Sequence, residues 1–146
     1  MPSRHLIACL ALAACTNAAS ADCFDSAAAY HRVNPWVLRA IAHGEAKYNP
    51  HAVARNQDRS VDVGMMQINS IHFPELQRHG IAPSALYDPC TSIFVAAWHL
   101  RKKVDKHGNT WKAVGAYHSE TPQHRDSYAE RIKRTIDGWI KAGHIR

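Results

Sequence analysis

Residues 34–46 read NPWVLRAIAHGEA, a pattern that predicts an amphipathic helix. Asn34 is a favoured N-cap, and Pro35 suits the first turn, where its missing N–H is not needed. At about 100° per residue, Leu38 and Ile41 fall on the same face as Glu45, close to the end of this helix. An acid on an apolar stripe is costly to bury unless it has a task, so Glu45 is a candidate functional group.

Helical spacing continues along the rest of the chain. The combination of cap and proline recurs at Asp88-Pro89 and Thr121-Pro122. No stretch alternates long enough to predict a major sheet, and the length suits one domain. We therefore expect an all-α single domain, with residues 47–63 as a loop. The expected helices start at about residues 25, 34, 69 or 70, 89, 110 and 122, and the third of them ends at Gly80.

The first 21 residues read as an export signal. Arg4 precedes the apolar run 6–14, which is too short to span a bilayer, and Ala19-Ser20-Ala21 fits a signal-peptidase site. The expected domain then covers residues 22–146 and lies in the periplasm. An alternative stays open, because residues 12–15 read LAAC and resemble a lipobox, in which Cys15 would be lipidated and would anchor the protein to a membrane.

Cysteine usage agrees with export. Cys9 and Cys15 lie in the signal, which leaves Cys23 and Cys90 as an even pair in an oxidising compartment. A single disulfide between them is the economical prediction, and two unpaired thiols are the alternative. Closing a loop of this length would stabilise the fold by roughly 4 kcal/mol in the chain-entropy treatment.

Charge and histidine content argue against several functions. The formal net charge of the chain is +6, but its basic residues are scattered and do not alternate with aromatics, so nucleic acid is not an expected partner. The eleven histidines include no HExxH motif. His43-Gly44-Glu45 and Pro89-Cys90 match part of a zinc-deaminase signature, yet Ile93 stands where the second cysteine would be. We expect no metal and no cofactor.

Three segments in order resemble the motifs of lytic transglycosylases. They are residues 45–50 (EAKYNP), 64–69 (GMMQIN) and 113–117 (AVGAY). The chain is most similar to the small exported members that accompany specialised secretion systems, type IV pili and conjugation machinery. Components of such an apparatus are therefore possible partners. The resemblance implies a lysozyme-like helical domain that cleaves the MurNAc–GlcNAc β-1,4 bond of peptidoglycan without consuming water.

The resemblance also implies roles for individual residues. Glu45 would protonate the glycosidic oxygen as general acid and then, as base, take the proton of the C6 hydroxyl, which closes onto C1 to leave a 1,6-anhydro end. Such a proton donor is ordinarily kept neutral near pH 7 by apolar surroundings. The expected substrate-binding residues are Gln67 and Asn69 on one wall, Met65 and Met66 as an apolar wall, and Tyr117 and His118 near the carboxylate or the glycan. Plain core packing is the alternative for both methionines.

Two departures from the family pattern leave other functions open. Ala46 stands where the family has serine, and His118-Ser119-Glu120 follow Tyr117 where the family has Asn-Ala-Gly. A module that binds peptidoglycan but cleaves it poorly is thus one alternative. A hydrolytic lysozyme is another, with Asp62 as the second acid, although a structural role for Asp62 is favoured because sequence cannot fix the separation of two carboxylates.

Overall fold

The computed structural model describes residues 22–145. The helices are α1 (Cys23–His31), α2 (Pro35–Ala46), α3 (Phe73–Arg78), α4 (Pro89–His107), α5 (Trp111–His118) and α6 (Pro122–Lys141). Three short strands, β1 (Val53–Arg55), β2 (Val61–Val63) and β3 (Ile68–Asn69), and two 3₁₀ turns, η1 (Ser70–His72) and η2 (Pro83–Tyr87), complete this part of the chain. The predicted helical, lysozyme-like single domain is confirmed. The predicted leader with Cys15 lies outside the described residues.

The helix starts follow the caps read from the sequence. The side-chain oxygen of Asn34 accepts a hydrogen bond from the Trp36 N–H at 2.8 Å, and that of Asp88 accepts one from the Thr91 N–H at 2.8 Å. The first helix departs from the prediction, because it begins at Cys23 with Asp22 as its cap. Asp25 instead forms an ion pair with Arg39 of α2.

The predicted loop 47–63 is wrong in part, since it contains two strands. β1 and β2 pair antiparallel with Val53 opposite Val63, and β3 adds to β2 with Asn69 opposite Asp62. The turn between β1 and β2 is closed by the Asn56 N–H, which donates to the Ser60 carbonyl at 2.9 Å. These strands are short and β1 is exposed along its length, so they lack the alternation that identifies a strand in sequence.

The expected helix from residue 69 or 70 to Gly80 is shorter and broken. Asn69 caps the 3₁₀ turn η1, and α3 then ends at Arg78. Gly80 has a φ of +76°, a backbone conformation that stops a helix and suits glycine. The 3₁₀ turn η2 was not expected and connects this region to α4.

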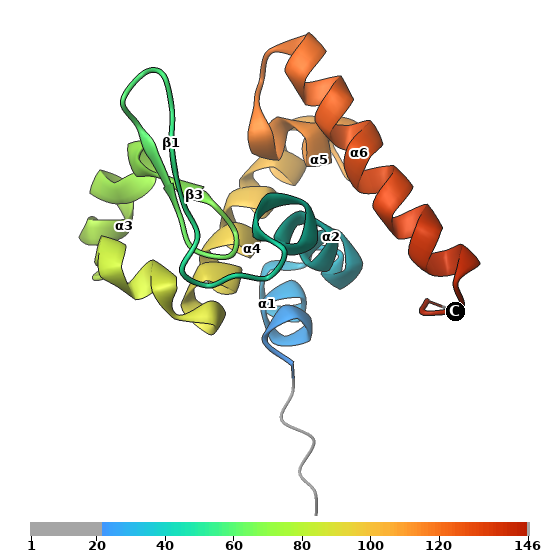
Figure 1. The fold of residues 1–146 in the computed structure, drawn as a ribbon, viewed down its shortest axis with the longest axis horizontal. Helices are drawn as coiled ribbons and strands as arrows, with labels where there is room; N and C mark the ends of the chain where they lie inside the picture. Colours follow the sequence, from blue (N-terminus) through green and yellow to red (C-terminus); the bar gives the residue numbers. More distant parts are fainter. Residues whose placement is uncertain (1–21, 146) are drawn as a thin grey trace, which may run out of the picture.

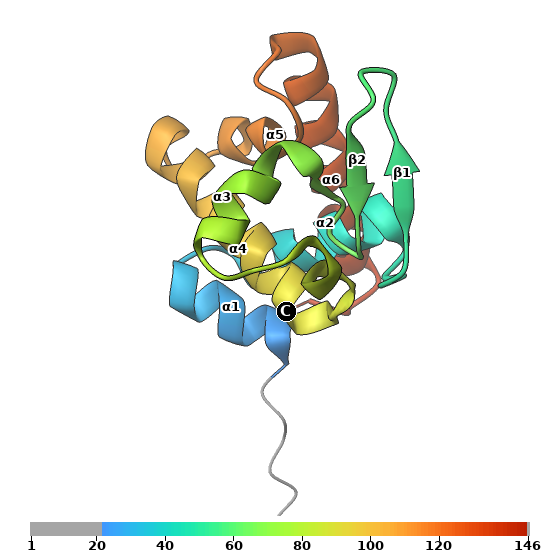
Figure 2. The ribbon, with the colours of Figure 1, turned by 90° about the vertical axis from the view of Figure 1, so that its left-hand side faces the viewer.

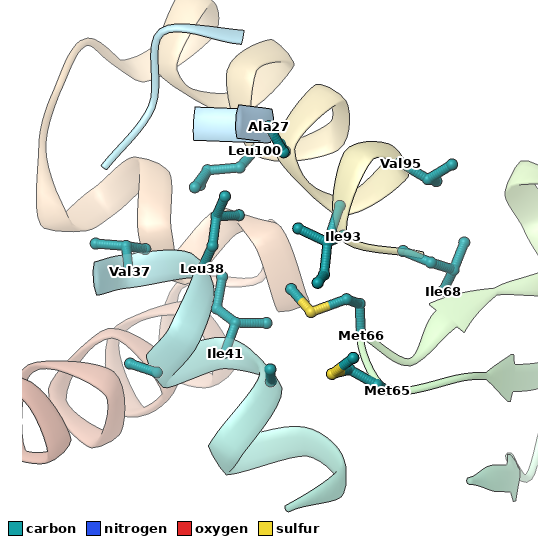
Figure 3. Close-up of a cluster of buried hydrophobic side chains, with 14 of the residues drawn as sticks. Ala27, Val37, Leu38, Ile41, Met65, Met66, Ile68, Ile93, Val95 and Leu100 are labelled. Carbon is teal, nitrogen blue, oxygen red and sulfur yellow. The ribbon is translucent and has the colours of Figure 1, made fainter. Parts of the chain in front are cut away.

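The core joins α2, α4 and the segment after β2. Its largest fully buried side chains include Leu38 and Ile41 of α2 and Leu100 of α4. Figure 3 shows Met66 with its side chain directed toward Ile41 and Ile93. Gly64, with a φ of +78°, brings its backbone so close to η2 that a Cβ there would lie 2.2 Å from the Leu86 carbonyl oxygen. The GMMQIN run therefore packs tightly against η2 at its first residue.

The two sides of the molecule meet over the end of α2. The β hairpin and α3 lie on one side of α2, and α5 and α6 lie on the other (Figure 1). The view turned by 90° places β1 and β2 beside α2, with α3 and α4 across from them (Figure 2). The predicted disulfide is present between Cys23 and Cys90 and ties α1 to the start of α4. Within residues 22–145, no helix has the length and apolar character that a membrane crossing needs.

Candidate active site

A cavity of about 420 Å³ opens between the hairpin and the end of α5, a size typical of ligand sites. The carboxyl end of α2 supplies Glu45 to it, and α4 supplies His99 and Lys103. The remaining lining residues come from the hairpin side (Asn56, Asp58, Ser60, Asp62, Gln67, Ile68, Asn69, Ile71 and His72) and from the end of α5 and the residues after it (Ala116, Tyr117, His118, Ser119 and Glu120).

Glu45 lies where the sequence pattern puts it, on the buried face of α2. Leu38 and Ile41 on that face are fully buried, whereas 18 % of the Glu45 side chain is exposed, into the cavity. The helix ends directly after it, because Lys47 and Tyr48 both have positive φ. Glu45 is thus a carboxylate at a helix end with an apolar floor behind it and open space in front.

Arg131 of α6 is a contact of Glu45 that the sequence did not reveal. Its Nη2 lies 3.3 Å from Oε1 of Glu45, and its Nη1 donates to the Gly44 carbonyl oxygen at 3.3 Å. The guanidinium also lies over the ring of Tyr128, 4.8 Å from the centroid. Glu45 is therefore approached from α6 by a cation whose position is held by three neighbours.

Tyr128 brings a second group from α6 to the carboxylate. Its hydroxyl is buried and has no hydrogen-bond partner among the described residues. Burial first, and then the charge of Glu45, raise the pKa of the Tyr128 hydroxyl well above its ordinary value. A neutral O–H group thus lies beside the candidate catalytic acid. In the sequence, helical spacing puts Tyr128 on the same stripe as Ile132 and Ile136, with no sign of a contact with Glu45.

Tyr117 connects two of the three motifs. Its hydroxyl donates a 2.9 Å hydrogen bond to the backbone carbonyl of Met66, which joins the end of α5 to the GMMQIN run. Burial, followed by the charges of Glu45 and Asp62, raises the pKa of Tyr117 well above its ordinary value. Tyr117 therefore lines the cavity as expected, but its hydroxyl is engaged with the backbone, not with the Glu45 carboxylate.

Asp62 faces the same cavity and is held by side-chain amides. Its Oδ2 accepts from Asn56 at 2.9 Å, and its Oδ1 accepts from Asn69 at 2.8 Å. Ser60 accepts further bonds from the amides of Asn56 and Asn69, at 3.0 Å each. The structural role favoured for Asp62 is present, and Asp62 also lines the same cavity as Glu45. Asn69, an expected sugar ligand, lines the cavity and also holds Asp62 in place.

Some residues of the GMMQIN motif line the cavity, and others lie in the core. Gln67 lines the cavity with a positive φ of 49°, and its amide donates to the carbonyls of Gly64 at 2.9 Å and Ala52 at 3.3 Å. Met65 and Met66 are buried in the core and do not line the cavity, so the expected apolar wall is wrong for them and the alternative, core packing, describes them. Ile68 and Ile71 supply apolar surface instead.

Two histidines complete the wall formed by α4 and α5. The ring of His118 stacks on Tyr128 with centroids 4.9 Å apart and planes 3° from parallel. His99 is 8 % exposed, and its Nε2 lies 3.1 Å from the Tyr117 carbonyl oxygen. Burial and the neighbouring His72 lower the pKa of His99 to about 4, so the ring is neutral at pH 7 and Nε2 donates to the carbonyl. Its Nδ1 is buried without a partner among the described residues.

The residues missed by sequence reasoning share one property, which is that they reach the site from a distant part of the chain. Arg131 and Tyr128 do so from α6, and the polar residues over 56–62 show no alternation that would indicate the hairpin network. Within residues 22–145, no group of three or more His, Cys, Asp and Glu side chains is placed to hold a metal ion.

Comparison with known proteins places this geometry in a family. Residues 22–140 match the family described as Transglycosylase SLT domain. The chain is 39 % identical over 130 residues to X polypeptide of Escherichia coli, which covers 84 % of this chain and 76 % of the relative. It is 38 % identical over 121 residues to Invasion protein IagB of Salmonella typhimurium (82 % and 76 % covered) and 38 % identical over 119 residues to Protein IpgF of Shigella flexneri (78 % of each). The chain belongs to the Transglycosylase SLT domain family, whose substrate is peptidoglycan.

Proposed function

We propose that this protein is an exported lytic transglycosylase that cleaves the MurNAc–GlcNAc β-1,4 bond of peptidoglycan and leaves a 1,6-anhydro end. The observation that carries the proposal is the placement of Glu45, a largely buried carboxylate at a helix end that opens into a sugar-sized cavity. The chain belongs to a family that acts on peptidoglycan, which supports the assignment of the substrate.

The proposed chemistry uses Glu45 twice. As general acid it gives its proton to the glycosidic oxygen, and as base it removes the proton of the C6 hydroxyl of the same MurNAc. The C6 oxygen then bonds to C1 while the leaving GlcNAc departs with the first proton, so no water is consumed. Arg131 contacts the carboxylate from α6 and would hold it in place, while Tyr128 places a neutral hydroxyl beside it that can donate a hydrogen bond as its charge changes.

Asp62 supports a second candidate, a hydrolytic lysozyme. A carboxylate on the opposite wall can stabilise positive charge on the sugar ring or attack C1, and the two amides that hold Asp62 give it a fixed position in the cavity. The two candidates differ in their product. Hydrolysis leaves a reducing MurNAc end, whereas the transglycosylase leaves an anhydro end that is lighter by one water.

The deciding experiment is mass spectrometry of muropeptides released from sacculi by residues 22–146. We expect anhydro ends, and we expect Glu45→Gln to abolish their release. Glu130→Gln is the matched control, because it makes the same change at an exposed position of α6. Reducing ends that disappear in Asp62→Asn would establish the lysozyme candidate instead. Sedimentation with sacculi and no released product would leave a binding module.

We also propose where the protein acts. Export through residues 1–21 would place it in the periplasm, and the LAAC sequence offers the alternative of a lipid anchor on Cys15. Relatedness to a protein named Invasion protein IagB supports a role in opening the wall locally for a secretion or pilus apparatus. Mass spectrometry of the N-terminus of the protein isolated from cells distinguishes cleavage after Ala21 from lipidation of Cys15.

A further inference from the structure

The lining of the cavity carries different charges on its two sides. The hairpin side and the end of α2 supply the neutral amides of Asn56, Gln67 and Asn69 and the carboxylates of Glu45, Asp58 and Asp62. The side formed by α4 and the residues after α5 is lined by Lys103 and Glu120, which belong to a cluster of ionised side chains. Neutral amides suit the hydroxyl and acetamido groups of a glycan, but a glycan strand offers no charge to the side lined by Lys103 and Glu120.

Glu120 lies among more cations than it can neutralise. Its Oε1 is 2.7 Å from Lys103 Nζ and 3.3 Å from Lys106 Nζ, and its Oε2 is 2.9 Å from His107 Nε2. The hydrogen bond from Lys103 lowers the pKa of Glu120, whereas burial raises it. The effect of Lys103 is the larger, and the pKa of Glu120 falls to about 2. Two lysines on one carboxylate leave one positive charge in excess, even with His107 neutral.

The other carboxylates of this region do not remove that excess. Asp105 of α4 is bound by Arg101, and Glu75 of α3 is bound by Lys102. Lys106 is the loosely held member of the cluster, because its side chain is 60 % exposed and its contact with Glu120 is the longest of the three. Its ammonium is thus free to take a further anionic partner from solvent.

We propose that the cluster of Lys103, Lys106 and Glu120 is a subsite for a free carboxylate of the peptidoglycan stem peptide. This inference rests on the proposed function. Stem peptides carry the charged groups of peptidoglycan, and they hang from the same MurNAc residues whose bond lies at Glu45 in the proposed reaction. Glu120 contacts both lysines, and it lines the cavity together with Lys103, which puts Lys106 next to the cavity lining.

The subsite also offers an explanation for one departure from the family pattern, at position 120. The residues after Tyr117 are His118-Ser119-Glu120, where the family pattern has Asn-Ala-Gly. A glycine at position 120 would have no carboxylate to gather the lysines of α4. The change therefore adds a carboxylate and its bound lysines beside the cavity.

The test compares two substrates, soluble glycan strands that bear stem peptides and the same strands after an amidase has removed them. Lys106→Met should lower kcat/KM on stem-bearing strands by about two- to fivefold, the effect of one exposed ion pair, and should change the rate on stripped strands little. Lys106→Glu should lower the first rate further. Lys112→Met is the matched control, an exposed lysine of α5, and should affect neither rate. The preference of the wild type for stem-bearing strands should shrink as salt rises.

Equal losses on both substrates would overturn the subsite, as would a Lys106→Met variant that matches the Lys112→Met control. Failure of the proposed function would look different, since the wild type would then either shorten neither substrate or leave reducing ends on both. The subsite can still be judged in that case with Glu45→Gln as the background. Fluorescence anisotropy with labelled soluble strands measures the binding of this inactive protein. Adding Lys106→Met should weaken binding to stem-bearing strands and leave binding to stripped strands unchanged.

Discussion

The neutral state of His99 predicts that the protein loses stability in mild acid. In the folded protein, burial and the proximity of His72 lower the pKa of His99 from 6.5 to about 4. The unfolded chain therefore binds a proton at His99 before the folded protein does. The resulting stabilisation is present in full above pH 6.5 and is lost as the pH falls toward 4.

The size of the effect follows from the two pKa values. With 6.5 for the unfolded chain and about 4 for the folded protein, His99 alone should lower the free energy of unfolding by about 2 kcal/mol between pH 7 and pH 5. The His99 side chain is almost fully buried, so solvent screening reduces this figure little. Protonation would also place a charge beside Lys102 and Lys103, which disfavour it in the folded protein.

Urea denaturation at pH 7 and at pH 5 measures this difference. His99→Gln removes the titrating group and keeps an N–H that can reach the Tyr117 carbonyl. Between pH 7 and pH 5, the free energy of unfolding of His99→Gln should fall by about 2 kcal/mol less than that of the wild type. This difference does not depend on the stability of the variant at pH 7. His124→Gln, at an exposed position of α6, should lose as much as the wild type. If His99→Gln and the wild type show the same dependence on pH, the neutral buried ring is refuted.

Three further changes test the site and its supports. Tyr128→Phe removes a buried hydroxyl that has no hydrogen-bond partner among the described residues, so stability should hold or rise by about 1 kcal/mol while the rate of glycan cleavage falls. Gly115→Ala puts a Cβ 2.2 Å from a backbone carbonyl oxygen of α6 and should lower the stability measured by thermal denaturation by about 3 kcal/mol. Gly138 has open space around it, so Gly138→Ala should stabilise the protein by up to about 1 kcal/mol. Replacing Cys23 and Cys90 by serine should cost roughly 4 kcal/mol in urea denaturation, and an unchanged midpoint would contradict the chain-entropy treatment.

Local signals predicted the parts of the fold that local chemistry decides. Caps such as Asn34 located helix starts, and the face shared with Leu38 located Glu45. Helical periodicity also placed Tyr128 correctly on a buried stripe, but periodicity says which face is buried and not what that face meets. Its neighbour Glu45 lies in another helix far away in the chain, so the sequence pattern could not predict this contact. The hairpin around Asp62 escaped because its strands are too short to show a period of two.

The arrangement of α5 and α6 explains how changes away from the cavity should reach Glu45. Gly115 lets α6 pack directly against the backbone of α5, with no room for a side chain between them. The same pair of helices supplies Tyr117, which is bonded to the Met66 carbonyl, and Arg131, which contacts Glu45. A methyl group at position 115 must push the helices apart, so it should displace the groups of α6 that touch the carboxylate while those of the hairpin stay in place. Gly115→Ala should therefore lower the cleavage rate even at temperatures where the variant is fully folded.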